Sequence, residues 1–165
     1  MPLKVDPRLN EIPALLQRGG DAARSAARAC LDAEADEIVK LARSYAPVLH
    51  HDVVGRHGIS IKAIQGTGDT SAGPLELSIK KVPGDILARG YTVEVTCGEG
   101  LGDYPVMMEE GLAPYGSGAF QLGPLSREKA ARGNKVGGKY MERALLDRQD
   151  GIPDRVAAAI KEVLK

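Results

Sequence analysis

A repeat of apolar residues at helical spacing, followed by a proline, is the feature that most constrains what this chain can fold into. The repeat starts after Asp21 and consists of Ala27, Leu31, Ala35, Ile38, Leu41, Ala42 and Tyr45, with charged residues on the other faces. It predicts a long amphipathic helix. Asp21 is a residue type suited to the N-cap, and Pro47 ends the helix because the residue before a proline avoids the α region.

Two later segments alternate apolar and polar residues with a period of two. They are L-E-L-S-I-K-K (residues 75–81) and Y-T-V-E-V-T-C (residues 91–97). Such alternation predicts half-buried antiparallel strands, with the long helix covering their apolar face. The C-terminal part returns to helical patterns: a helix around K-Y-M-E-R-A-L-L-D-R (139–148), a stop at Gly151, and a last helix with Pro153 in its first turn.

This order of elements predicts an α+β fold. We expect a long N-terminal amphipathic helix and C-terminal helices packed on a small, mainly antiparallel sheet. The length of 165 residues fits a single domain over 1–165. Residues 1–20 form an N-terminal extension in this interpretation, and residues 112–138 form a long Gly/Pro-rich loop or arm. Residues 48–74 are expected to be a loop with a short strand around Ile59 and Ile61. Connections this long are usually functional.

The charge balance argues against a protein that grips nucleic acid non-specifically. Lysine plus arginine and aspartate plus glutamate both number 22, so the net charge is zero. Aromatic residues make up only 4%, which leaves few rings to stack on single strands. Cys30 and Cys97 have no metal-site or redox spacing and are expected to be reduced thiols. The sequence shows no secretion signal and no membrane-spanning stretch, which favours a protein of the cell interior.

The stretch Y-P-V-M-M-E-E-G, from Tyr104 to Gly111, is interpreted as a strand that ends at a glycine. Glu109 and Glu110 would then point to opposite faces, so they cannot flank one bond as an acid/base pair. Met107 and Met108 are expected to fill irregular gaps, either in the core or against a partner.

The segment G-N-K-V-G-G-K-Y (133–140) approaches the spacing of a phosphate-binding loop but fails its two requirements. Tyr140 stands where serine or threonine should bind magnesium, and a polar, charged stretch precedes the segment instead of a buried strand. Nucleotide binding is therefore not expected.

Two alternatives stay open on chemical grounds. His50, His51, Asp52 and His57 could collect a metal ion, as in a small metal-dependent hydrolase, although their spacing matches no familiar site. The basic residues of the long loop could contact DNA phosphates, as in a DNA-binding protein, or acidic residues of a partner; they are Arg127, Lys129, Arg132, Lys135 and Lys139. No nucleophile motif is present. We therefore expect a non-enzymatic protein with no catalytic residue, no cofactor and no metal.

The order of short motifs resembles a known family. A helix ends in A-x-x-Y-A-P (42–47), T-S-A-G-P-L-E-L-S-I follows (70–79), and then come an alternating strand, Y-P-V-M-M-E-E-G and G-K-Y-M-E-R-A-L before a closing helix. From about Asp21 onward this resembles the tail-completion or head–tail joining proteins, including neck and minor tail proteins, of long-tailed, lambda-like bacteriophages. Pro105, Pro74 and the longer segments 48–69 and after Gly111 depart from that pattern.

The resemblance implies a structural virion protein that forms a ring, typically hexameric, at the head–tail junction. It would act in tail completion, in the neck or as a tail terminator after assembly in the cytoplasm of the host bacterium. Its partners would be copies of itself, connector or stopper proteins and tail-tube proteins, with DNA passing through the lumen without sequence-specific binding. The subunit interface would then include Tyr104, Met107, Met108, Glu109, Gly111, Leu112, Pro114, Tyr115 and Phe120.

Overall fold

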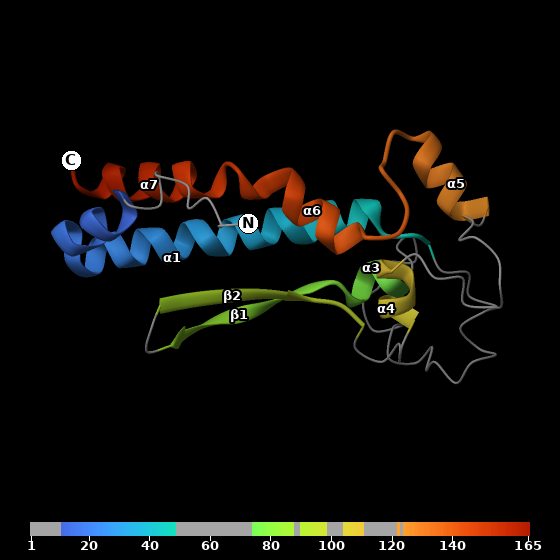
Figure 1. Cartoon of the computed structure of the whole chain (residues 1–165), viewed down its shortest axis with the longest axis horizontal. Coiled ribbons are helices and arrows are strands. Elements are labelled where there is room, and N and C mark those ends of the chain that lie inside the picture. The colour runs from blue at the N-terminus through green and yellow to red at the C-terminus, as the bar shows by residue number, and fades with distance from the viewer. Residues whose placement is uncertain (1–10, 49–73, 88–89, 99–103, 111–121, 123) are drawn as a thin grey trace, which may run out of the picture.

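The computed structural model describes residues 11–48, 74–87, 90–98, 104–110, 122 and 124–165 (Figure 1). Its elements, in chain order, are α1 (Glu11–Tyr45), α3 (Pro74–Ser78), β1 (Lys80–Leu87), β2 (Gly90–Thr96), α4 (Tyr104–Glu109), α5 (Pro124–Ala131), α6 (Tyr140–Gln149) and α7 (Ile152–Val163). The predicted α+β class, the long N-terminal helix and the two C-terminal helices are confirmed.

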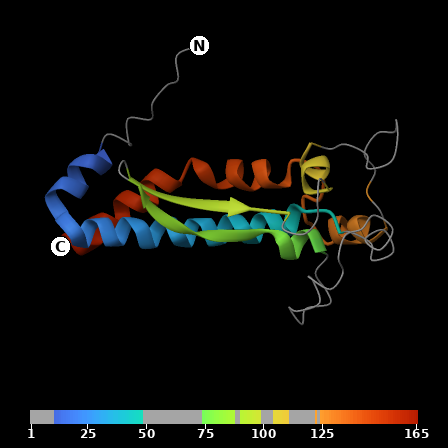
Figure 2. The ribbon, with the colours of Figure 1, turned by 90° about the horizontal axis from the view of Figure 1, so that it is seen from below.

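The elements form two layers. In one layer, α1 lies antiparallel beside α6 and α7, which follow each other along its length (Figures 1 and 2). In the second layer, the β1–β2 hairpin packs on α1, as the sequence predicts for the apolar stripe of the long helix. The short helices α3, α4 and α5 gather at the end where α1 stops. A two-stranded hairpin is marginally stable alone, so the helices must stabilise it.

The first ten described residues, which fall in the predicted N-terminal extension, are part of the folded domain. Residues 11–19 are helical, and the backbone reverses at Gly20, which has φ +56° and ψ −134°. Gly19 lies against α7, because a Cβ atom built there would fall 2.7 Å from Cδ2 of Leu164. The helix therefore begins before Asp21 and breaks at Gly20. Its C-terminal end at Tyr45, just ahead of Pro47, is as predicted.

The hairpin confirms one predicted strand and corrects the other. The strand predicted at 91–97 is β2, and it pairs antiparallel with β1 in the register Lys81↔Val95 and Ile86↔Tyr91. The strand predicted at 75–81 is wrong over most of its length, because residues 74–78 form α3 and β1 begins at Lys80. The register shifts between Val82 and Asp85, where Pro83 and Gly84 interrupt the ladder as a bulge does.

Two further predictions of local structure are wrong. The stretch from Tyr104 is a helix, α4, and not a strand that reaches an edge. The predicted loop over 112–138 contains α5, whose Ser126 is buried and exchanges hydrogen bonds with the backbone of Val48. Residues 134–139 are irregular and lead into α6.

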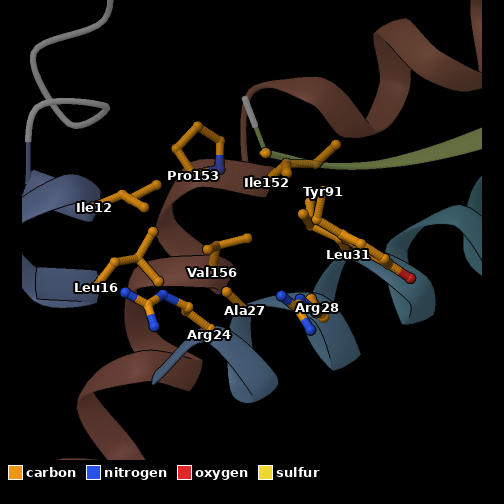
Figure 3. Close-up of a pocket in the computed structure, with 11 residues that line it drawn as sticks. Ile12, Leu16, Arg24, Ala27, Arg28, Leu31, Tyr91, Ile152, Pro153 and Val156 are labelled. Carbon is orange, nitrogen blue, oxygen red and sulfur yellow. The ribbon is translucent and has the colours of Figure 1, made fainter. Parts of the chain in front are cut away.

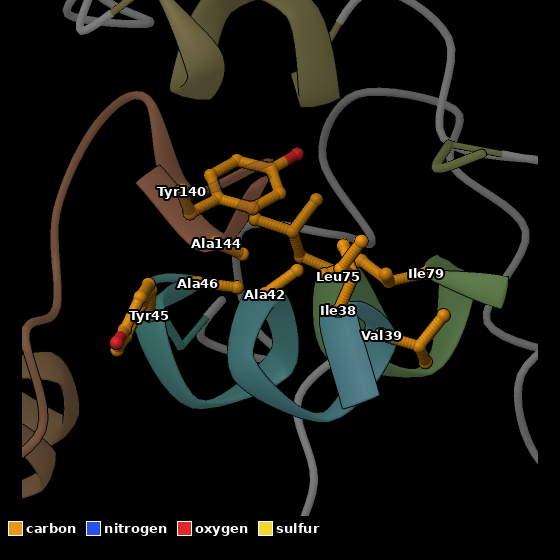
Figure 4. Packing of buried hydrophobic residues seen from close by; sticks show 9 residues of the cluster. All are labelled: Ile38, Val39, Ala42, Tyr45, Ala46, Leu75, Ile79, Tyr140 and Ala144. Carbon is orange, nitrogen blue, oxygen red and sulfur yellow. The ribbon is translucent and has the colours of Figure 1, made fainter. Parts of the chain in front are cut away.

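The core consists of two clusters along α1. One lies at its C-terminal end and packs α1, α3 and α6 around the fully buried Tyr140 (Figure 4). Its members are Ile38, Val39, Ala42, Tyr45, Ala46, Leu75, Ile79, Tyr140 and Ala144. The other joins α1 to α7 through Ala23, Ala27, Val156 and Ile160. Small alanines on α1 let α7 approach closely, so the interface is tight although it has few large side chains.

Candidate functional site

An open apolar pocket lies where the N-terminal half of α1, the start of α7 and the start of β2 meet (Figure 3). Its volume is about 490 Å³. Ile12 and Leu16 line one side, Ile152, Pro153 and Val156 of α7 line another, and Ala27, Leu31, Gly90 and Tyr91 complete the wall. The charged side chains of the lining are Arg24 and Arg28, both from α1.

A second cavity of about 440 Å³ continues along β2 toward α6. It shares Leu31, Tyr91 and Ile152 with the first pocket, so the two are neighbouring parts of one groove. Residues unique to this part are Glu34, Ala35, Ile38, Val93, Val95, Met141, Glu142 and Leu145. We call the whole the β2 groove and its first part the α7 pocket. The apolar side chains of β2 face it and are only half-buried.

Tyr91 and Arg28 form the polar border between the two parts of the groove. The hydroxyl of Tyr91 donates to Asp32 Oδ2 at 2.8 Å, and the Arg28 guanidinium lies 5.7 Å from the centre of the Tyr91 ring. Lys81 of β1 contacts Asp36 at 2.8 Å and the carbonyl of Asp32 at 3.2 Å. These contacts fix the hairpin on α1, so the groove has a preformed wall.

A charged cluster missed by the sequence analysis joins α1, α6 and α7. Glu34 is 6% exposed, and its carboxylate accepts hydrogen bonds from Arg148 at 2.7–3.1 Å and from Arg155 at 2.5–2.8 Å. The same Arg155 also donates to the carbonyl of Arg148 at 3.0 Å, near the junction of α6 and α7. Burial by itself raises the pKa of Glu34, but the hydrogen bonds and charges of both arginines outweigh it and hold the pKa below its ordinary 4.5.

Glu109 has a role that its predicted place in a strand would not allow. Its carboxylate accepts hydrogen bonds from the backbone N–H groups of Met141 (3.0 Å) and Glu142 (2.9 Å), so it caps the N-terminus of α6. Its carbonyl also accepts from the N–H of Lys139 at 2.6 Å. Glu110, the next residue, is exposed. Tyr104, Met107 and Met108 belong to α4, and their place in a subunit interface stays a prediction.

The five basic residues predicted to contact DNA or an acidic partner do not share one environment. Lys129 is held inside the chain: its ammonium donates to the carbonyls of Arg43 (2.6 Å) and Ala46 (2.8 Å) and pairs with Glu76 of α3. It thus neutralises the C-terminal end of α1. The other four are exposed, and three of them pair with carboxylates of the chain: Arg132 with Glu128, Lys135 with Asp147 and Lys139 with Glu142.

Lys135 belongs to a cluster around the end of α1. The hydroxyl of Tyr45 donates to Asp147 at 2.6 Å, and Lys135 donates to the same carboxylate oxygen at 2.8 Å. The cations of Lys135 and Arg143 each lie 5.6 Å from the centre of the Tyr45 ring. The hydrogen bond to Asp147 and burial raise the pKa of the Tyr45 hydroxyl above its ordinary 10.0. These contacts hold the irregular segment before α6 against α1.

That irregular segment supports the argument against a phosphate-binding loop. The residues before it form a helix, α5, and not the buried strand that the motif needs. Lys139 adopts a left-handed conformation (φ 54°, ψ 36°) directly before α6. Its side chain pairs with Glu142 within the first turn of that helix.

The remaining predicted site residues lie outside the described part of the chain. They are His50, His51, Asp52 and His57 of the metal alternative, and Gly111, Leu112, Pro114, Tyr115 and Phe120 of the predicted interface. Within the described ranges, no three histidine, cysteine, aspartate or glutamate residues are arranged to hold a metal ion. Cys30 and Cys97 are free thiols, as predicted, and burial raises the pKa of Cys30 above 9.0.

Comparisons with protein-family models, with curated proteins and with solved structures give no match for this chain. Among the described helices, none combines the length and apolar character that crossing a membrane requires.

Proposed function

We propose that this protein is a structural, non-enzymatic virion protein that forms a ring at the head–tail junction of a tailed bacteriophage. The role would be tail completion, a neck component or a tail terminator. The ordered series of motifs described above supports this proposal. The α+β fold, with a long helix, a hairpin and closing helices in that order, agrees with the order of elements on which the resemblance depends.

The observation that carries the proposal is the uncovered β2 groove. Side chains such as Leu31, Tyr91 and Val95 line it, yet the described part of the chain leaves it open. An apolar groove open to water is typical of a surface that meets another protein. A subunit built to stack against identical neighbours would carry such a surface, and burial of its apolar area stabilises the contact by about 25 cal/mol per Å².

The ion pairs within the subunit also suit a structural protein. Glu34 with its two arginines and Lys129 with Glu76 connect separate helices within one subunit. The balanced net charge suits a ring through which DNA slides. Arg127, which is exposed at the α5 end, remains a candidate contact to DNA or to an acidic partner.

Electron microscopy of the purified protein, alone and mixed with tail tubes, tests this proposal. We expect rings of uniform diameter, or caps seated at one end of the tube. A protein that neither forms rings nor binds tubes or connectors would contradict the proposal. So would stoichiometric zinc that is lost in a His51→Ala variant, because that result favours the hydrolase alternative.

A second test concerns the loop predicted over 112–138. Since α5 is packed through Ser126 and Lys129, only residues 112–121 should be deleted. We expect a folded subunit that fails to assemble. Unchanged assembly would contradict a role of this segment between subunits.

A further inference from the structure

The α7 pocket is suited to large apolar side chains from another chain. Its volume is about 490 Å³, and its wall is apolar except for Arg24 and Arg28. Arg24 pairs with Asp21, and Arg28 lies over the Tyr91 ring, so both cations already have partners. The pocket therefore offers an apolar interior and does not demand an anion.

One segment of the chain has the matching chemistry. Between Glu110 and Arg127 the sequence contains no charged residue and no histidine. Within it, residues 111–121 lie outside the described part of the chain and carry Leu112, Tyr115 and Phe120; Phe120 is the single phenylalanine of the protein. In a chain with only 4% aromatic residues, rings in an uncharged stretch are candidates for burial against a partner. We call residues 111–121 the uncharged segment.

Both flanks of this segment are anchored at the far end of the molecule. On one flank, the carbonyl of Glu109 accepts a hydrogen bond from the N–H of Lys139. Close to Lys139 in the chain, the N–H of Gly137 donates to the carbonyl of Tyr45, where α1 ends. On the other flank, Ser126 is hydrogen-bonded to Val48, just beyond the same helix end. Figure 1 shows α4 and α5 together at this end, opposite α7 and the first turns of α1.

Phe120 cannot fill the α7 pocket of its own chain. It precedes Pro124, the first residue of α5, by four residues, or at most roughly 14 Å of extended chain. The helix α5 lies at the end where α1 stops, and Ala27, in the wall of the pocket, precedes Tyr45 by about 18 residues, or roughly 27 Å of helix. Phe120 can therefore reach this pocket only in a second copy.

We propose that the α7 pocket receives the uncharged segment of a neighbouring copy, with Tyr115 and Phe120 as the inserted side chains. A pocket at one end and its ligand at the other make a heterologous contact, which closes into a ring when the rotation between copies permits. The inference rests on the proposed function, since it assigns the contact that would hold the ring together.

The first test uses a labelled peptide, G-L-A-P-Y-G-S-G-A-F-Q (residues 111–121), titrated with the full-length protein and followed by fluorescence anisotropy. We expect saturable binding that weakens at least tenfold in two pocket variants, Leu16→Glu and Pro153→Glu. Pro153 is the safer site, because glutamate suits the first turn of α7 and should leave the fold intact. Val163→Glu, on α7 but outside the pocket, should bind like the wild type.

Circular dichroism and thermal unfolding confirm that each variant is folded. A peptide in which Tyr115 and Phe120 are both replaced by serine should not bind. Absence of wild-type binding up to about 1 mM peptide would overturn the inference. Equal binding by the wild type and Pro153→Glu would overturn it as well.

The second test mixes two full-length variants in sedimentation velocity. Pro153→Glu keeps the uncharged segment but loses the pocket. The Tyr115→Ser/Phe120→Ser variant keeps the pocket but loses the two aromatic rings that insert into it. Each should be monomeric alone, and the mixture should stop at a heterodimer with one intact contact. A mixture that remains monomeric, at concentrations where the wild type associates, would overturn the assignment.

The two proposals fail in different ways. If the Pro153→Glu and the Tyr115→Ser/Phe120→Ser proteins each form rings like those of the wild type, the pocket assignment is overturned and the ring proposal stands. A peptide that binds the pocket, in a protein that never assembles or joins tails, would support the pocket assignment and contradict the ring.

Discussion

Arg148 contacts both carboxylate oxygens of Glu34, although the two residues are 114 positions apart in the chain. Arg155 also contacts both oxygens, so the two arginines together fasten α1 to the junction of α6 and α7. The cluster lies beside the second cavity, whose wall includes Glu34. The shape of the β2 groove therefore depends on a charge network, and this dependence can be tested directly.

Replacing Glu34 by glutamine should destabilise the protein by about 2–3 kcal/mol. The change leaves two arginines facing each other without their shared anion, and partial exposure of both arginines keeps the cost below the ~3–5 kcal/mol typical of fully buried pairs. Urea unfolding measures the effect. Asp36→Asn, which breaks an exposed pair with Lys81, is the control and should cost less than about 1 kcal/mol. Equal costs for the two variants would contradict a structural role of the cluster.

The same carboxylate should govern stability in acid. Because the pKa of Glu34 is lower in the folded state than in the unfolded state, its contribution is complete above the ordinary pKa of 4.5. It is lost as the pH falls through the folded-state pKa. Unfolding free energies measured from neutral pH to about pH 3 should therefore fall more steeply below pH 4.5 in the wild type than in Glu34→Gln. Parallel curves would show that other carboxylates control the acid transition.

Adjacent glutamates at the end of α4 should differ sharply in importance. Glu109→Gln keeps one acceptor of the two that cap α6 and removes the negative charge near the helix N-terminus, so it should cost about 1 kcal/mol. Glu110 is exposed, so Glu110→Gln should change the free energy of unfolding by no more than about 0.5 kcal/mol. Thermal unfolding of the pair makes the comparison. If Glu110 proved the more important residue, the capping assignment would be wrong.

Lys129 should behave as a residue of the fold. Lys129→Met leaves Glu76 without its cation and removes a donor from two carbonyls at the end of α1, at a cost of about 2–3 kcal/mol. Arg132→Met, one residue beyond the same helix and in an exposed pair with Glu128, should cost less than about 0.5 kcal/mol. Hydrogen exchange at residues 125–131 should rise in the first variant alone. Unchanged exchange in Lys129→Met would contradict this role.

Two neighbouring glycines should resist substitution for different reasons. Gly20→Ala forces a side chain onto a backbone at φ +56°, at a cost of about 1–2 kcal/mol, although nothing lies within 4 Å of the new Cβ. Gly19→Ala meets a steric obstacle, because its Cβ would fall 2.4 Å from that of Ala23. Guanidinium unfolding of both variants gives the costs. A Gly20→Ala protein of wild-type stability would exclude the backbone reversal described here.

Sequence periodicity was sufficient where the segments are long. The helix up to Tyr45, the strand at Gly90–Thr96 and the two C-terminal helices each repeat their pattern often enough to be unambiguous. It failed for five- and six-residue helices. Leu75 and Ile79 fit strand alternation, but they are also four residues apart, and the structure buries both in one core cluster, Leu75 in α3 and Ile79 directly after it.

A local signal for these short helices was nevertheless present. Pro74, Pro105, Pro124 and Pro153 each occupy the first or second position of a helix, where proline is favoured. Only Pro153 was assigned to the start of a helix from the sequence. By contrast, the partners of Glu34, Glu109 and Lys129 depend on how distant elements approach each other, and no local pattern encodes that.

The backbone reversal at Gly20 has a practical consequence for anyone who labels this protein. It places Glu11 against Lys161, 2.7 Å apart, so the start of α1 and the end of α7 share one end of the molecule with the α7 pocket. A bulky fusion after Lys165 would therefore emerge close to that pocket and obstruct whatever docks there. A small fluorophore at the same position would instead report docking through its change in emission.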